Sequence, residues 1–179
     1  MNTARITTPV FGVTGWKNSG KTTLVTKLVE GLTGRGYRVS TIKHAHHAFD
    51  IDKEGADSYR HREAGASEVA IVSGKRWALM HELRGEDEPA LDDVIARLSP
   101  CDIVIIEGYK REDHPKIEAR RLDARNREPL APQDPHIVAI AADYPLEGET
   151  LPGFAIDDVA SMVDFIIDHA RLPRRDAAE

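Results

Sequence analysis

Nine consecutive residues decide the fold: Gly15-Trp16-Lys17-Asn18-Ser19-Gly20-Lys21-Thr22-Thr23. They fit the pattern G-x-x-x-x-G-K-[ST], which is typical of a phosphate-binding loop. The run before them, 10–13, is apolar and predicts a buried strand. The stretch after them, 24–32, carries apolar side chains at helical spacing. Strand, glycine-rich loop and helix in this order are the context that the motif needs, so the stretch predicts a nucleotide phosphate site.

The chemistry of this loop follows from its residue types. Glycines let the backbone curl until consecutive N–H groups point at phosphate oxygens, and the positive end of the following helix adds to the attraction. Lys21 is expected to reach the β- and γ-phosphates, and the Thr22 hydroxyl is expected to bind Mg²⁺. Trp16 could cover a nucleotide or shield its phosphates. The other nucleotide-binding candidates in the loop are Gly15, Lys17, Asn18, Ser19, Gly20 and Thr23.

The composition describes an ordinary acidic protein. The chain has 179 residues, a hydrophobic fraction of 41% and a net charge of -6, which does not favour a nucleic-acid partner. Cys101 is the only cysteine, so an internal disulfide is excluded, in agreement with a reducing compartment. No apolar run is long enough to span a membrane, and the N-terminus lacks the layout of a signal peptide. We therefore expect a cytoplasmic protein.

The rest of the chain alternates strands and helices, which predicts a three-layer α/β P-loop NTPase domain. Further strands are expected at 37–42, 102–107, 116–119 and 136–142, and helices at 57–64, 89–98 and from Asp157, its N-cap, onward. A strand, a crossover helix and a second strand predict a mostly parallel sheet. The runs 68–72 and 76–81, joined by a short polar turn, predict an antiparallel β-hairpin insertion. We expect one domain over 1–170, an exposed loop over 120–135 and a flexible tail over 171–179.

Several of the expected strands end in residues of functional interest, because open parallel sheets bind ligands beyond the carboxyl ends of their strands. Glu107 occupies the place of the acid that holds Mg²⁺ or orients the attacking water in phosphate-loop proteins, so it is both a metal and a catalytic candidate. Asp102 begins the same strand, roughly 16 Å away, and cannot share that role. The alternative is that Glu107 only caps the turn at Gly108. Asp143 follows the strand 136–142 on the same side of the sheet.

Three histidines, His44, His46 and His47, follow the second expected strand. They are compatible with Zn²⁺ or Ni²⁺ binding, but no cysteine lies near them in the sequence. A loop that supplies donors to an anionic ligand fits equally well. Asp50 and Asp52 fall where the same loop could reach Mg²⁺, with solvated acids as the alternative. Asp50 is therefore a third metal candidate.

Several blocks of the sequence together resemble a known family. They are the phosphate loop, Lys43-His44-Ala45-His46-His47, Asp50, Asp57-Ser58-Tyr59-Arg60, Ala64-Gly65-Ala66 and Ile106-Glu107-Gly108-Tyr109-Lys110. In this order they resemble the molybdopterin-guanine dinucleotide biosynthesis adaptor (MobB) family. The phosphate loop alone occurs in many families, whereas the later blocks are far more specific. The resemblance covers most of 11–110 and is weaker after Lys116.

This resemblance implies an accessory protein of molybdenum cofactor maturation that binds GTP with Mg²⁺ and hydrolyses it weakly. It also implies a homodimer that works as an adaptor beside molybdopterin guanylyltransferase, the enzyme that attaches GMP to molybdopterin. Guanine-specific relatives carry Asn-Lys-x-Asp after a late strand, whereas this chain offers Ala141-Ala142-Asp143. Asp143 is therefore the candidate that accepts from guanine N1 and N2. The choice of GTP over ATP rests on the resemblance.

The strand-end loops offer more donors than one triphosphate needs. The candidates for a second, anionic ligand, such as the phosphate of a molybdopterin-type cofactor, are Lys43, His44, His46, His47, Arg60 and Lys110. Two other functions on the same fold stay open. A small-molecule kinase would need a lid of arginines, which 120–127 could supply. A nickel-inserting GTPase is supported only by the histidines.

The expected hairpin also predicts how a homodimer would form. A two-stranded insertion leaves backbone N–H and C=O groups unpaired at its edge unless something covers them. Trp77, Leu79 and Met80 add apolar area beside that edge. Pairing with the same strand of a second copy would satisfy the backbone, whereas a neighbouring loop is the alternative cover.

Overall fold

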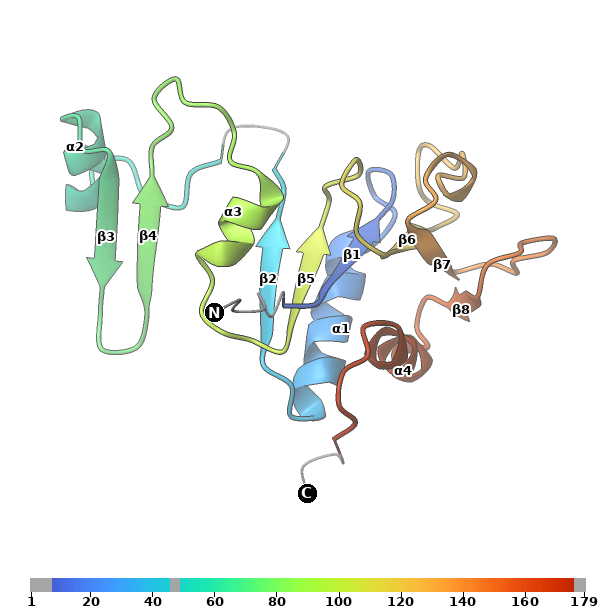
Figure 1. Ribbon diagram of the computed structural model, residues 1–179. Coiled ribbons are helices and arrows are strands. Elements are labelled where there is room, and N and C mark those ends of the chain that lie inside the picture. Colours follow the sequence, from blue (N-terminus) through green and yellow to red (C-terminus); the bar gives the residue numbers. More distant parts are fainter. Residues whose placement is uncertain (1–7, 46–48, 176–179) are drawn as a thin grey trace, which may run out of the picture. The chain divides into compact units, whose positions relative to one another are not determined.

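The computed structural model describes residues 8–45 and 49–175, which form two compact units (Figure 1). Residues 8–44 and 97–175 form the first unit, which contains the phosphate loop. The second unit lies within 45–96 and contains the hairpin. In the chain, the second unit is therefore an insertion between two strands of the first.

A six-stranded parallel sheet forms the centre of the first unit. Its strands lie in the order β2-β5-β1-β6-β7-β8, and every neighbouring pair is parallel. The bounds are β1 Val10–Thr14, β2 Val39–Lys43, β5 Ile103–Glu107, β6 Lys116–Arg120, β7 Ile137–Ala142 and β8 Gly153–Ala155. The mostly parallel sheet predicted from the sequence is confirmed. β8 is not among the predicted strands, because three residues are too few to show a period.

One face of this sheet carries the hydrophobic core. Alternate residues of a strand face opposite sides, and the odd-numbered residues of four strands belong to the core: Phe11, Val13, Ile103, Ile105, Ile117, Ala119, Ala139 and Ala141. Helices α1, Lys21–Gly34, and α4, Val159–His169, pack against it with Leu24, Leu28, Leu32, Met162, Val163 and Ile166. Removal of this apolar surface from water stabilises the unit and holds α1, with its N-terminal loop, against the sheet.

β6 is buried along its whole length although it carries three charges. Lys116 donates to Asp134 at 3.1 Å, and Glu118 accepts from the Leu130 N–H at 2.8 Å and from Arg120 at 2.8 Å. Buried charges are tolerated when they are paired in this way. Arg120 is thus the last residue of a buried strand, and its placement in an exposed loop was wrong. Arg120 also pairs with Glu149, which is 29 residues away in the sequence, so no local pattern predicts that this charge is buried.

The N-terminus of α4 also differs from the prediction. Its N-cap is Asp158, whose carboxylate accepts from the Ser161 N–H at 3.2 Å, and not Asp157. Asp157 instead pairs with Lys27 of α1 at 2.6 Å. Either aspartate fits the capping pattern, and only the backbone geometry directs the second of them at the helix.

The second unit confirms the predicted antiparallel hairpin. Its elements are α2 Asp57–Glu63, β3 Glu68–Val72, β4 Trp77–His81 and α3 Leu91–Ala96. β3 and β4 pair from Glu68↔His81 to Val72↔Trp77. The longest helix among the described residues is α1 with 14 residues, and none of these helices is long and apolar enough to cross a membrane.

Candidate nucleotide-binding site

The phosphate loop lies between β1 and α1, where the sequence predicts it. β1 ends at Thr14, α1 begins at Lys21, and Gly15 and Gly20 have φ angles of 146° and 84°. A Cβ atom on Gly15 would lie 2.5 Å from the carbonyl oxygen of Ala119, so the backbone of β6 leaves no room for a side chain there. This close approach shapes a loop that can present N–H groups and a helix N-terminus to an anion.

Lys21 is held inside its own loop. Its Nζ donates to the carbonyl oxygen of Trp16 at 2.7 Å. Burial lowers the pKa of Lys21, the positive charge of Lys110 lowers it further, Glu107 opposes the shift and Lys43 adds to it. Three ammonium groups around one carboxylate repel one another, and a bound phosphate would relieve that repulsion. The electrostatics therefore favour an anionic ligand.

Thr22 and Glu107, two of the metal candidates, are in direct contact. The Thr22 hydroxyl donates to Glu107 Oε1 at 2.8 Å, and Lys43 Nζ lies 3.2 Å from the same oxygen. The strand register explains this meeting, because Glu107 pairs with Val13 of β1 on one side and with Lys43 of β2 on the other. A hydroxyl and a carboxylate are hard oxygen ligands of the kind that Mg²⁺ takes together with phosphate oxygens and water. The donor set fits Mg²⁺ held jointly with a nucleotide.

Trp16 connects the phosphate loop to two other loops of the first unit. Its Nε1 donates to the carbonyl oxygen of Glu128 at 2.7 Å. Lys110 Nζ lies 4.3 Å from the centroid of its indole ring, a cation–π contact. The segment after β6 and the loop after β5 therefore both contact this one side chain, which lies in the middle of the phosphate-binding motif.

Asp143 lines a cavity of about 200 Å³ that begins at the first turn of α1. The lining residues are Gly20, Thr23, Leu24, Lys27, Arg121, Asp143, Ile156 and Asp157. Asp143 accepts from the Leu122 N–H at 2.9 Å and from Arg121 Nε at 3.3 Å. A larger cavity of about 690 Å³, lined by residues within 142–157, shares Asp143 and two other residues with it. These cavities lie beside the loop that would hold the phosphates, so they are the candidate base and ribose site.

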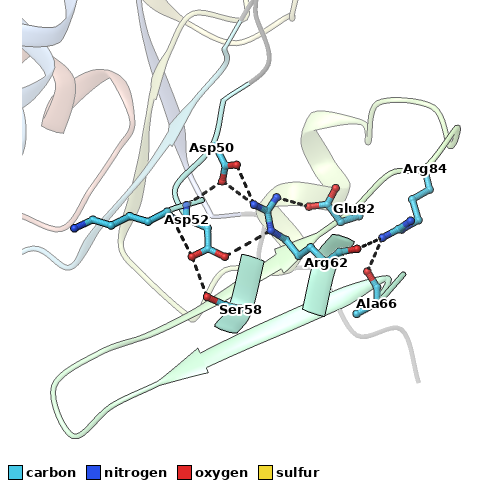
Figure 2. Close-up of polar contacts among 8 residues, drawn as sticks. Asp50, Asp52, Ser58, Arg62, Ala66, Glu82 and Arg84 are labelled. Atoms are coloured by element: carbon cyan, nitrogen blue, oxygen red, sulfur yellow. Dashed lines mark hydrogen bonds and ion pairs between the residues drawn. The ribbon is translucent and has the colours of Figure 1, made fainter. Parts of the chain in front are cut away.

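Asp50, the third metal candidate, lies in the second unit and binds an arginine there (Figure 2). Arg62 Nη2 donates to both carboxylate oxygens of Asp50, at 3.0 and 2.9 Å, and Arg62 Nη1 donates to Glu82 at 2.9 Å. Asp52 Oδ2 lies 3.7 Å from Arg62 Nε. The Asp52 N–H and then the Arg62 side chain lower the pKa of Asp50. We call Arg62, Asp50, Asp52 and Glu82 the Arg62 cluster; the metal role of Asp50 stays a prediction.

The candidates for a second ligand are distributed over both units. In the first unit, Lys43 pairs with Glu107, the His44 ring lies 4.5 Å from the Tyr109 ring, and Lys110 lies on Trp16. In the second unit, Arg60 is exposed on α2, 3.9 Å from Asp57. Lys43, His44 and Lys110 thus lie at or just after the carboxyl ends of the neighbouring strands β2 and β5.

The remaining two candidates, His46 and His47, lie outside the described residues. Within 8–45 and 49–175, no group of three or more His, Cys, Asp or Glu side chains is arranged to hold a metal ion. The hypothesis of a Zn²⁺ or Ni²⁺ site therefore still rests on the sequence alone.

Three residues at these sites make contacts that were not predicted from the sequence. Arg121 lies within the predicted arginine segment, but its contact with Asp143 has no local signal. Tyr109 takes a φ of 48°, and only its position after Gly108 hints at a turn. Arg62 looks like any other arginine of a short exposed helix, because its acidic partners come from a loop and from β4.

The chain is similar to proteins of known family. The family model of "Molybdopterin guanine dinucleotide synthesis protein B" matches residues 10–143. The "Molybdopterin-guanine dinucleotide biosynthesis adapter protein" of Escherichia coli K12 is 39% identical over 162 residues, which cover 89% of this chain and 92% of that protein. The protein with the same description from Haemophilus influenzae is 41% identical over 162 residues, covering 88% and 87%.

Solved structures agree with these sequence matches. The MobB protein homolog from Bacillus stearothermophilus is 31% identical with a TM-score of 0.66, over 90% of this chain and 97% of that one. The MobB of Bacillus subtilis is 26% identical with a TM-score of 0.73, over 92% and 98%.

Proposed function

The chain belongs to the family of molybdopterin guanine dinucleotide synthesis protein B, and on this premise we propose that it is a GTP-binding adapter in molybdopterin-guanine dinucleotide biosynthesis. The observation that carries the nucleotide part is the arrangement of Lys21, which is held inside a glycine-bounded loop among other ammonium groups. Mg²⁺ is held by Thr22 and Glu107 together with the phosphates. Their contact at 2.8 Å supports this assignment.

Guanine is read by Asp143 in the cavity beside α1. Its carboxylate accepts from the N1–H and 2-amino groups of guanine after Arg121 moves aside, whereas adenine has no such pair of donors. Calorimetric titration with GTP and with ATP tests this assignment. Wild type binds GTP more tightly, and Asp143→Asn reduces the ratio of the two affinities by about tenfold, because the variant loses a carboxylate that pairs with two donors of guanine but not of adenine. Equal affinities of wild type for GTP and ATP would contradict the guanine assignment but not the assignment of the phosphate loop.

Hydrolysis is slow in the isolated protein. Fast phosphoryl transfer needs extra positive charge on the transferring group, often from an arginine. Arg121 lies beside Gly20 but pairs with Asp143 in this structure. Release of phosphate from GTP is measured with and without the guanylyltransferase. Rapid turnover of the isolated protein, or transfer of phosphate to a metabolite instead of water, would favour the kinase alternative.

The adapter acts in the cytoplasm beside the guanylyltransferase that attaches GMP to molybdopterin. The descriptions of the relatives from Escherichia coli and Haemophilus influenzae support this role. A tagged copy is expected to retain the transferase from a cytoplasmic extract, and more of it with GTP than without. Failure to retain the transferase under either condition would contradict the adapter role and would leave the proposal of nucleotide binding unaffected.

The protein is a homodimer joined through the hairpin. In the described residues β3 and β4 pair only with each other, so each strand has an open edge. Val72 and Trp77 are 75% and 67% exposed, and Ile71 and Leu79 are also exposed. Light scattering should give a dimeric mass at micromolar concentration and a monomeric one for Leu79→Lys, with Lys75→Glu at the turn as the control. A monomeric wild type would contradict the proposal.

A further inference from the structure

Lys110 brings a third positive charge to the phosphate loop. Its charge is, after burial, the next cause of the lowered pKa of Lys21. Lys43 is the other ammonium group that acts on Lys21, and it already has a carboxylate partner in Glu107. Within the described ranges Lys110 forms no ion pair, and its Nζ lies instead over the ring of Trp16. A positive charge is thus held at a site that already carries an excess of positive charge.

The turn after β5 holds Lys110 in this position. Gly108 and Tyr109 have φ angles of 97° and 48°, and the Tyr109 ring packs against His44. A left-handed backbone is unfavourable for tyrosine, and such residues persist where the surrounding structure enforces them, often at functional sites. The stacking on His44 and the left-handed turn together bring Lys110 back over the loop.

The Trp16 side chain is fixed in place, but its contact with Lys110 is weak. The indole is anchored through its hydrogen bond to the Glu128 carbonyl oxygen at 2.7 Å. A cation–π contact of a partly exposed lysine is weaker than a charge-assisted hydrogen bond to a phosphate oxygen. An anion placed in the loop would therefore draw Lys110 off the ring, and the environment of Trp16 would change.

The position of Lys110 indicates which phosphate of a bound nucleotide it would meet. The N–H groups of the loop surround the inner phosphates, and the metal ligands of a phosphate loop lie on the side of the terminal phosphate. Lys110 follows Glu107 by three residues, and Glu107 contacts Thr22. Lys110 thus approaches from the side of the terminal phosphate.

We propose that Lys110 binds the terminal phosphate of a nucleoside triphosphate, so that the protein distinguishes triphosphate from diphosphate, and that Trp16 holds Lys110 when this phosphate is absent. The inference rests on the proposed function, since it needs the loop to bind a guanine nucleotide. It assigns to Lys110 a different role from the second anionic ligand predicted from the sequence, and the titrations below distinguish the two.

Trp16 itself supplies the measurement. The chain has two tryptophans, so Trp77→Phe leaves Trp16 as the only one. This variant is titrated with GDP and with a non-hydrolysable GTP analogue, both with Mg²⁺, while the fluorescence of Trp16 is followed; calorimetry gives the affinities. The analogue is expected to change the emission more than GDP does. Lys110→Ala in the same background should weaken the analogue by about tenfold or more and leave GDP within about twofold, since one charge-assisted hydrogen bond is lost.

Two matched variants separate this role from a general effect of charge. Lys110→Arg keeps the charge and should retain most of the preference for triphosphate, whereas Arg111→Ala removes an exposed neighbouring charge and should leave both affinities near wild type. Equal weakening of the analogue and GDP in Lys110→Ala, or no weakening of either, would overturn the inference while guanine nucleotide binding stands. If Trp77→Phe with an intact Lys110 binds neither nucleotide, the proposed function fails instead, and with it the premise of this inference.

Discussion

Two charged clusters with opposite composition lie in the two units of this protein. The phosphate-loop cluster, Lys21, Lys43, Lys110 and Glu107, has three positive groups and one acid, whereas the Arg62 cluster has one positive group and three acids. In the Arg62 cluster, hydrogen-bond donors of the protein itself offset part of the excess negative charge. For example, the Asp52 N–H donates to Asp50. In the phosphate-loop cluster two of the cations rest on a carbonyl oxygen and an aromatic ring.

We infer from this difference that the Arg62 cluster is structural and that the phosphate-loop cluster binds a ligand. Acids that receive backbone and guanidinium hydrogen bonds are stabilised in place by the protein itself. Ammonium groups held by weak acceptors next to one another gain free energy when a phosphate arrives. Composition alone would have made both clusters equally attractive as sites, and the partners of each charge decide between them.

The largest expected effect tests the phosphate-loop cluster. Lys21→Ala should weaken GTP by about a hundredfold, because it removes a charge-assisted contact with the phosphates. The midpoint of thermal unfolding should stay within a degree or two of wild type, since the Lys21 side chain contacts the loop and not the core. Calorimetry and thermal unfolding are compared with those of Lys75→Ala, an exposed lysine in the hairpin turn. Unchanged GTP affinity in Lys21→Ala would remove the phosphate-loop assignment.

A smaller effect is expected at the metal ligands. Thr22→Ala and Glu107→Gln should each reduce the gain in GTP affinity that Mg²⁺ provides by about tenfold, because each removes one oxygen ligand or its orientation. Titrations with Mg²⁺ and with a chelator measure this gain. Thr26→Ala, one turn further along α1, loses a hydroxyl that only bonds its own helix and should behave as wild type. If Thr22→Ala and Glu107→Gln both keep the Mg²⁺ dependence of wild type, the metal is bound elsewhere.

The same comparison predicts the opposite outcome in the second unit. Arg62→Ala leaves Asp50, Asp52 and Glu82 without their shared partner, so the midpoint of thermal unfolding should fall by several degrees. The affinity for GTP should change little. Arg60→Ala is the matched control, because Arg60 is exposed and lies 3.9 Å from its nearest acid, Asp57. Strong loss of GTP binding in Arg62→Ala, with an unchanged midpoint, would contradict a structural role for this cluster.

The smallest effect concerns pH. The pKa of Asp50 is lowered in the folded protein, so its contribution to stability is complete above its unfolded pKa and is lost as the pH falls through its folded pKa. Thermal unfolding is followed between pH 7 and pH 3. Asp50→Asn should lose less stability than wild type over the acid end of this range and should differ from it at neutral pH by a constant amount. If the stabilities of wild type and Asp50→Asn fall in parallel down to pH 3, Asp50 does not contribute to the pH dependence of stability.

Much of the fold can be predicted from local sequence patterns. The apolar runs of β1 and β5 predict buried parallel strands, and the alternation of β3 and β4 around a polar turn predicts the hairpin, because both signals depend on neighbouring residues. The phosphate loop is equally local, since its chemistry needs only glycines, one lysine and one hydroxyl at a fixed spacing. Glu107 follows from the rule that ligands bind at the carboxyl ends of parallel strands.

The sequence by itself thus determined the family, the parallel sheet with its hairpin, and the loop that would hold the phosphates. Only the tertiary structure decided what each charged side chain meets. It placed Lys110 on Trp16, turned Asp50 toward Arg62, and paired the buried Arg120 with Glu149. The physical reason is the distance along the sequence over which each interaction acts. Backbone patterns are set by residues within a few positions of one another, whereas the pairing of charges depends on which strands and loops are brought together, and that depends on the whole sheet.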